Sequence, residues 1–100
     1  MATVFHGEFE WDDAKARANL AKHGVPFDYA ARVFLDPGMV EFDASHEGDS
    51  EIRRKAVGLI EGKLFVVVFT DRDGICRIIS ARRANTKERR AYDPVHPQTR

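Results

Sequence analysis

The spacing of apolar and polar positions changes along the chain from helical to alternating. After a short extended segment at residues 9–11, residues 13–23 are rich in Ala, Lys and Arg, which favour a helix. Asp12 is placed to cap this helix, and Gly24 is placed to follow its end in the left-handed conformation. Residues 26–34 predict a second helix, because Pro is common at a first turn and the apolar side chains that follow share one face.

The second half of the chain has the pattern of a sheet. Alternating or continuous apolar runs predict four strands, at residues 39–43, 52–61, 64–71 and 75–83. Tight turns at Gly62-Lys63 and residues 72–74 predict hairpins between the last three strands. The near-continuous apolarity of residues 64–69 indicates a central strand covered on both faces. Asn85 is placed to cap a short third helix, with Glu88 completing a capping-box pair. We therefore expect an α+β fold with two N-terminal helices, a four-stranded antiparallel sheet and a short C-terminal helix.

Length and composition are those of a small globular protein. The chain has 100 residues, of which 43% are hydrophobic and 32% charged, so it is too apolar for a disordered class. We expect one domain over residues 1–100, with a core at about 9–92 and a loose tail at 93–100. No apolar run approaches the roughly 20 residues of a membrane helix, and the first residues lack the features of a signal peptide. We therefore expect a soluble, cytoplasmic protein that does not associate with membranes.

The two halves of the chain carry opposite charge. Residues 1–50 contain 4 Lys and Arg against 10 Asp and Glu, a net charge of −6, whereas residues 51–100 contain 12 against 6, a net charge of +6. Such asymmetry predicts a basic face suited to a polyanion and an acidic face suited to a cationic partner. The alternative is that folding mixes the halves and the segregation disappears.

Arginines stand at the ends of the predicted strands. Parallel directions put the start of the second strand beside the start of the fourth, so Arg53 is expected nearest Arg77 in height. Arg82 and Arg83 are then about one strand length away. A joint site for Arg53 and Arg82 would need strong twist or a shift in register.

Several other kinds of site find no support in the sequence. His6, His46 and His96 are scattered, and no pair has metal-ligand spacing, so we expect neither a metal nor another cofactor. Ser80 is not in the sharp turn that presents a nucleophilic serine. The single cysteine, Cys76, lies in an apolar strand and is most simply a small buried residue.

Three blocks of the sequence resemble the BrnT-type toxins. They are Phe9-Glu10-Trp11-Asp12 with Asn19-Leu20-Ala21-Lys22-His23-Gly24-Val25 and Phe27, then Glu51-x-Arg53 before a strand that ends near Gly58, and Arg77-Ile78-Ile79-Ser80-Ala81-Arg82-Arg83-Ala84 with Glu88 and Tyr92. The resemblance runs from about Phe9 to Tyr92. The Lys-His-Gly and Arg-Ile-Ile-Ser-Ala-Arg-Arg-Ala blocks are specific together, although either alone is weak. Pro26 departs from the pattern, because relatives often have a capping Ser or Thr there.

The resemblance implies a ribonuclease toxin with a compact RelE-like fold. Such a toxin of a type II toxin–antitoxin module would cut RNA without a metal and arrest growth by inhibiting translation. It would be neutralised by a ribbon-helix-helix antitoxin, called BrnA, and would meet operator DNA only through that antitoxin. The rival interpretation is a non-catalytic RNA- or protein-binding module on the same fold. The oligomeric state stays open, a homodimer included.

The resemblance and the chemistry of RNA cleavage together assign roles to residues. Cleavage needs a group that takes the 2′-OH proton, cations that stabilise the phosphorane, and an acid for the leaving 5′-oxygen. Histidine is the side chain that most often transfers protons, so His23 is expected to do so, while Arg53 and Arg82 are expected to hold the phosphorane through bidentate guanidinium groups. Substrate-binding roles are expected for Lys22, Arg77, Arg83 and Tyr92.

Each of these residues also has a structural alternative. His23 could stabilise the end of its helix through the helix dipole. Arg53 and Arg82 could form salt bridges to Glu51, Asp71 or Glu88. Tyr92 could stack on a base, or it could be an aromatic residue at the edge of the core.

Overall fold

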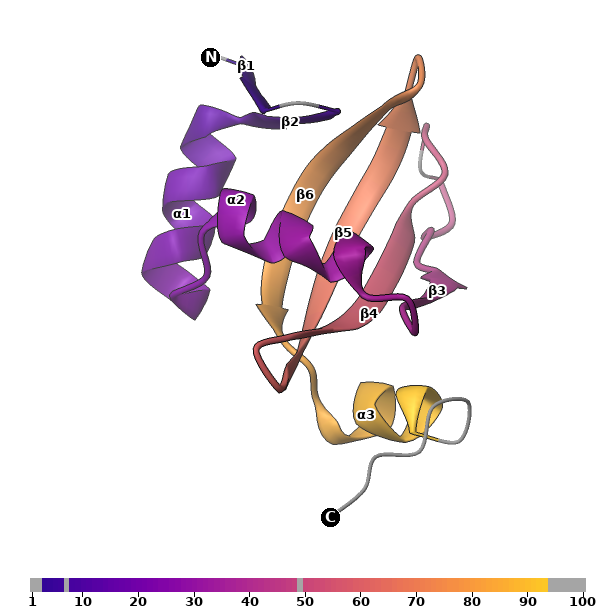
Figure 1. The fold of residues 1–100 in the computed structure, drawn as a ribbon. Coiled ribbons are helices and arrows are strands. Elements are labelled where there is room, and N and C mark those ends of the chain that lie inside the picture. Colours follow the sequence, from indigo (N-terminus) through magenta and orange to yellow (C-terminus); the bar gives the residue numbers. More distant parts are fainter. Residues whose placement is uncertain (1–2, 7, 49, 94–100) are drawn as a thin grey trace.

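The computed structural model describes residues 3–6, 8–48 and 50–93 (Figure 1). Its strands are β1 (Thr3–His6), β2 (Phe9–Asp12), β3 (Val40–Asp43), β4 (Arg54–Ile60), β5 (Lys63–Arg72) and β6 (Ile75–Arg83). Its helices are α1 (Asp13–His23), α2 (Phe27–Ala30), the 3-10 helix η1 (Ala31–Leu35) and α3 (Thr86–Tyr92). The expected loose tail after residue 93 lies outside the described residues.

The described strands form one mixed sheet in the order β1-β2-β6-β5-β4-β3. β2 and β6 run parallel, and the other neighbours are antiparallel. The structure is α+β, but the expected RelE-like sheet of four antiparallel strands behind two N-terminal helices is wrong. The sequence predicts no strand at β1, and it predicts an extended segment at residues 9–11, where β2 lies, but not the place of that segment in the sheet. Glu10 in β2 is buried because it pairs with Arg77 in β6, a contact that no local pattern encodes.

The first helix begins and ends where the sequence predicts. Asp12 accepts a hydrogen bond from the Lys15 N–H (3.0 Å), and Gly24 follows the last turn at φ 71°. The second predicted helix is wrong in type, because α2 has four residues and continues as the five-residue 3-10 helix η1. Aromatic and β-branched residues such as Tyr29 and Val33 favour an α-helix weakly. Packing against the sheet therefore sets the geometry of this segment.

One face of the sheet, here called the closed face, is covered by α2 and η1, with α1 lying along β6 (Figure 1). It carries the larger core, whose buried members include Trp11, Phe27, Val33, Phe65, Phe69 and Ile78. η1 approaches β4 closely at Gly58, where an added Cβ would lie 2.9 Å from Cγ1 of Val33. The closed face is thus filled by apolar side chains in tight contact.

The opposite face, here called the open face, has a smaller core of Val57, Leu64, Val66 and, from α3, Tyr92. The sequence-predicted capping box is confirmed, because Asn85 and Glu88 exchange hydrogen bonds with each other's backbone N–H groups (2.9 Å each). β5 contributes buried residues to both cores, which confirms the expected central strand. α3 has only seven residues and lies toward the end of the sheet where β6 ends (Figure 1).

β2 pairs with only the first part of β6, and further along β6 the side chain of Asn19 makes the edge hydrogen bonds. The Asn19 amide donates to the Ala81 carbonyl (2.8 Å) and accepts from the Ala81 N–H (3.1 Å), as a neighbouring strand would. The same amide donates to the Val25 carbonyl (3.1 Å), which ties the segment after α1 to the sheet. Asn19 is the buried residue of α1, whereas Leu20 is 47% exposed. A polar contact therefore fixes α1 against β6.

None of the described helices is long and apolar enough to cross a membrane.

Candidate functional site

A hollow lined by basic side chains lies on the open face, between the loop that joins β3 to β4 and strand β6. We call it the basic groove. Its volume is about 380 Å³, and it is lined by Ala44, His46, Arg53, Lys55, Val68, Ile79, Ser80 and Arg82. It therefore brings together two of the arginines that the sequence singled out.

The register of the strands explains this meeting. Lys55 pairs with Val68, which pairs with Ser80 on its other side, so the three lie in a row across the sheet. We expected Arg53 and Arg82 to be about one strand length apart unless the register shifted. The register does shift, at an irregularity in β5–β6 beside Val68, which moves Arg82 one position toward Arg53. Long side chains on both residues then reach the same groove.

Glu88 of α3 holds two of the basic groups. Arg82 donates two hydrogen bonds to its carboxylate (2.7 and 2.6 Å), and Lys55 donates a third (3.1 Å). The Glu88 side chain is 3% exposed. Burial by itself would raise the pKa of Glu88, but hydrogen bonds from Arg82, the Asn85 N–H and Lys55 lower it to about 2. The hydrogen bond to Glu88 also raises the pKa of Arg82. Arg82 is thus a fixed cation with a set orientation.

Arg53 is positioned through its backbone. Its N–H donates to Oγ of Ser45 (2.8 Å), and its carbonyl accepts from the Ser45 hydroxyl (3.2 Å) and from the Ala44 N–H (2.8 Å). Within the described part of the chain, its guanidinium has no ion pair. Arg53 is therefore a positioned cation whose charge is available to an anion.

Two further predicted residues do not line the groove. Arg77 pairs with Glu10 across β2 and β6, and its side chain is 18% exposed. Arg83 lies over the ring of Phe65, 5.4 Å from its centroid, and Phe65 belongs to the closed-face core. Arg82 and Arg83 are adjacent in the chain but serve opposite faces of the sheet, as alternation in a strand requires.

Tyr92 is 2% exposed and packs in the open-face core. Its hydroxyl donates to Oδ2 of Asp36 (2.9 Å), and burial together with this carboxylate raises the pKa of Tyr92 to about 12. A buried ring cannot stack on a base unless α3 moves, so in this structure Tyr92 is a core residue.

Lys22 and His23 lie in the last turn of α1, and both side chains are exposed. Asn19, one turn earlier, contacts the edge of β6 at Ala81, which places this end of α1 beside that edge. Neither residue lines the basic groove. The expectation that His23 transfers protons stays a prediction.

The sequence reasoning missed Lys55 and His46 as groove residues. The signal was available in the pairing of β3 with β4, because Asp43 pairs with Arg54 and so brings the two ends of the connecting loop together. His46 follows Asp43 closely, and Arg53 precedes Arg54. A predicted hairpin therefore indicates that these flanking residues meet, even when the connecting loop is long.

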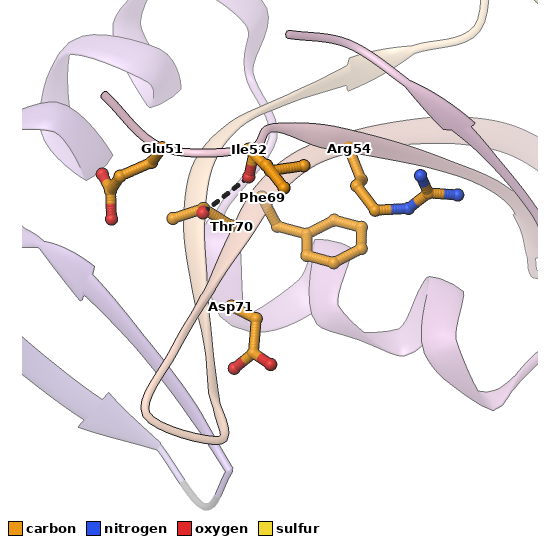
Figure 2. A pocket seen from close by; sticks show the side chains of 6 residues that line it. All are labelled: Glu51, Ile52, Arg54, Phe69, Thr70 and Asp71. Atoms are coloured by element: carbon orange, nitrogen blue, oxygen red, sulfur yellow. Dashed lines mark hydrogen bonds between the residues drawn. The ribbon is translucent and has the colours of Figure 1, made fainter. Parts of the chain in front are cut away.

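Figure 2 shows a different hollow, of about 340 Å³, lined by Glu51, Ile52, Arg54, Phe69, Thr70 and Asp71. Ile52 is 72% exposed, and its carbonyl accepts a hydrogen bond from the Thr70 hydroxyl (2.7 Å). Arg54 pairs with Glu41, and Glu51 pairs with Arg72. Since its cation is already paired and carboxylates line it, this hollow suits an anion less well than the basic groove.

The described residues offer little for metal or thiol chemistry. There, no cluster of three or more His, Cys, Asp or Glu side chains could hold a metal ion. Cys76 is half-buried, and burial raises the pKa of its thiol to about 12, so it is a poor nucleophile at neutral pH. The groove can instead hold a phosphate between fixed cations, with a histidine beside it.

One protein-family model matches most of the chain. The family model described as the ribonuclease toxin BrnT of type II toxin–antitoxin systems matches residues 11–88, which include the basic groove and its Glu88 anchor. The comparison with curated proteins yields no match. Because the family model covers most of the chain, the chain belongs to the BrnT family of ribonuclease toxins of type II toxin–antitoxin systems.

Proposed function

We propose that the basic groove binds RNA and cleaves it without a metal, and that this cleavage arrests growth by inhibiting translation in the cytoplasm. The observation that carries the proposal is that Arg53, Lys55, Arg82 and His46 line one hollow. RNA binding depends strongly on cations placed against phosphates, and cleavage depends on cations placed where the phosphorane charge develops.

Cleavage in this proposal is a displacement at phosphorus. The 2′-oxygen attacks the adjacent phosphorus as its proton leaves to a base, and the bond to the 5′-oxygen breaks as that oxygen gains a proton. The products are a 2′,3′-cyclic phosphate and a free 5′-hydroxyl. Arg53, whose guanidinium has no ion pair among the described residues, takes the phosphate, while Arg82, held by Glu88, stabilises the added charge.

The proton-transfer group in this proposal is His46. It lines the groove with Arg53 and Arg82, and histidine is the side chain that most often transfers protons in catalysis. His23, at the end of α1, is the alternative that the family resemblance suggested. RNA that passed over the edge of β6 would meet it, so paired variants must decide between the two.

The proposal is tested with two arginines that are adjacent in the chain. Arg53 lines the groove, whereas Arg54 pairs with Glu41 (3.0 Å), so Arg53→Ala and Arg54→Ala remove the same charge from different places. We expect Arg53→Ala to lower the rate of RNA cleavage by about 100-fold or more and Arg54→Ala to stay near the parent rate. Equal rates for Arg53→Ala and the parent would show the assignment to be wrong.

The metal-free mechanism has its own experiment. Purified protein is incubated with naked RNA in EDTA, and the new 3′ ends are characterised. Activity should persist and leave 2′,3′-cyclic phosphate. Ends of the 5′-phosphate type, or activity restored only by a divalent ion, would contradict this mechanism. Tight binding of RNA without any cleavage would favour the rival, a non-catalytic RNA-binding module.

For the antitoxin partner, we propose a ribbon-helix-helix protein that covers the basic groove with an acidic segment and binds operator DNA itself. Charge complementarity would orient the two proteins, since Arg53, Lys55 and Arg82 give the groove a basic lining. Arg53→Glu should weaken the complex, while Asp28→Lys on the exposed start of α2 should change it little. The reverse result would place a basic antitoxin on the acidic half of the chain.

A further inference from the structure

A second hollow on the open face adjoins the basic groove. It has a volume of about 300 Å³ and is lined by Phe42, Asp43, Lys55, Lys87, Glu88 and Ala91. Lys55 lines both hollows, so its side chain forms the boundary between them. A ligand that occupies the groove therefore has a continuation toward α3 and β3.

The apolar wall of this second hollow is an aromatic ring. Phe42 lies on β3, directly paired with Lys55 of β4, and packs against the open-face core while staying partly exposed. The packing fixes the ring from one side, and the hollow leaves it accessible from another. Positioned aromatic rings of this kind are the surfaces on which bases of single-stranded RNA stack.

The charges around the ring suit a nucleotide. Lys87 is exposed, and within the described residues it has no ion pair. Two carboxylates also line the hollow: Glu88, which Lys55 and Arg82 already neutralise, and Asp43, which is exposed at the end of β3. The hollow thus offers a ring for a base and ammonium groups for the phosphates on its sides.

We propose that the hollow at Phe42 is a nucleobase subsite, which receives a base next to the phosphate held in the basic groove. This inference rests on the proposed function, because the groove must bind RNA for its neighbour to receive a base. Stacking is stronger for two-ring bases, so the subsite favours a purine. Lys87 and Lys55 contact the flanking phosphates.

The test separates binding of bases from binding of the backbone. The probes are two octamers with 2′-O-methyl riboses, which cannot be cut: one of adenosines and one with the same backbone but no bases. Phe42→Leu keeps an apolar side chain in the open-face core but removes the ring, and Phe42→Trp keeps a ring. Phe34→Leu is the matched control, since Phe34 is also partly buried but packs against the closed-face core. Affinity is measured by fluorescence anisotropy, with folding checked by circular dichroism.

We expect Phe42→Leu to weaken binding of the adenosine octamer by about fivefold or more and to leave the base-free octamer unchanged. Phe42→Trp and Phe34→Leu should bind both as the parent does. If Phe42→Leu binds the adenosine octamer as tightly as the parent while Arg53→Ala does not, the proposal of a nucleobase subsite is wrong, but RNA binding in the basic groove is supported. If neither variant changes the binding, the proposed function fails as well. A loss with Phe34→Leu equal to that with Phe42→Leu would also overturn the subsite, because the effect would then be structural.

Discussion

The closed and open faces of this sheet are held by different forces. On the closed face, apolar side chains from α2 and η1 pack on the strands, and Gly58 lets the backbone of η1 come close. On the open face, the short helix α3 is tied down largely by polar groups. Glu88 binds Arg82 and Lys55, and Tyr92 binds Asp36.

This difference separates stability from function. Where apolar side chains fill the closed face, they leave little room for a ligand, and the arginine in the hollow beside Phe69 is already paired with Glu41. The open face is only partly covered, and its buried carboxylate keeps two cations oriented beside a hollow. Charges that are fixed before a ligand arrives need little reorganisation in a transition state. We therefore expect changes on the open face to alter activity and changes on the closed face to alter stability alone.

The largest effect should come from removing the histidine of the basic groove. His46→Ala should lower the rate of RNA cleavage by about 100-fold or more, because proton transfer by a positioned group contributes that much. His23→Ala is the matched control, and we expect its rate to stay near that of the parent. The measurement is single-turnover cleavage of one RNA across pH 5 to 9. If His23→Ala loses activity and His46→Ala does not, the chemistry lies at the edge of β6 and not in the groove.

The next effect concerns the carboxylate that anchors the open face. Glu88→Gln keeps a side chain that can complete the capping box but removes the charge between Arg82 and Lys55. We expect the free energy of unfolding to fall by about 3 kcal/mol, as when one partner of a buried ion pair is lost. Urea denaturation at pH 7 measures the change. A change well below this value would mean that apolar contacts alone hold α3.

The same carboxylate predicts how this difference depends on pH. The pKa of Glu88 is lowered from 4.5 to about 2, so its contribution to stability is complete above about pH 4.5 and is lost as pH falls toward 2. The gap in unfolding free energy between the parent and Glu88→Gln should therefore narrow across that range. A gap that stays constant between pH 5 and pH 2 would contradict the lowered pKa.

The local parts of this fold could be predicted from sequence because each depends on neighbouring residues. Asp12 and Gly24 bound α1 as expected, and Asn85 with Glu88 forms the expected capping box. β3 lies within the strand predicted at residues 39–43, but β1 and the parallel pairing of β2 with β6 could not be predicted in this way. β2 depends on a parallel partner far along the chain, with Glu10 buried by its contact to Arg77.

The site shows the same division between local and distant information. The sequence analysis identified Arg53 and Arg82 as candidates. Both line one groove because of the register shift in β5–β6, and no sequence motif predicts that shift. Glu88 could be predicted as a cap, yet its second role as the partner of Arg82 and Lys55 needs the sheet and α3 to be docked. Lys55 lies in the groove because the strand register sets it beside Val68 and Ser80.

On the closed face, a smaller effect should follow from a single added methyl group. Gly58→Ala puts a Cβ 2.9 Å from Cγ1 of Val33 and 3.0 Å from its carbonyl oxygen, so η1 or β4 must shift. We expect the free energy of unfolding to fall by about 1–3 kcal/mol, with no change in the cleavage rate of the folded protein. Urea denaturation and an activity assay at a temperature where the variant is folded test both parts. Lost activity in a fully folded variant would mean that the two faces are coupled.

The smallest effect should come from the ion pair between Arg54 and Glu41, which matches the Lys55–Glu88 pair in distance but is more exposed. Arg54 and Glu41 lie on neighbouring strands with Nε and Oε1 3.0 Å apart, but their side chains are 42% and 38% exposed. Water screens such a pair and the side chains lose freedom when they form it, so Glu41→Gln should cost less than about 1 kcal/mol of unfolding free energy. The distance in this pair is close to the 3.1 Å between Lys55 and Glu88. Burial and not distance should therefore decide which carboxylate contributes more to the free energy of unfolding. Urea denaturation of Glu41→Gln beside Glu88→Gln, in 0.05 M and 0.5 M salt, makes the comparison directly. If both variants lose the same free energy of unfolding, burial does not distinguish the Glu88 ion pairs from the exposed pair of Arg54 and Glu41.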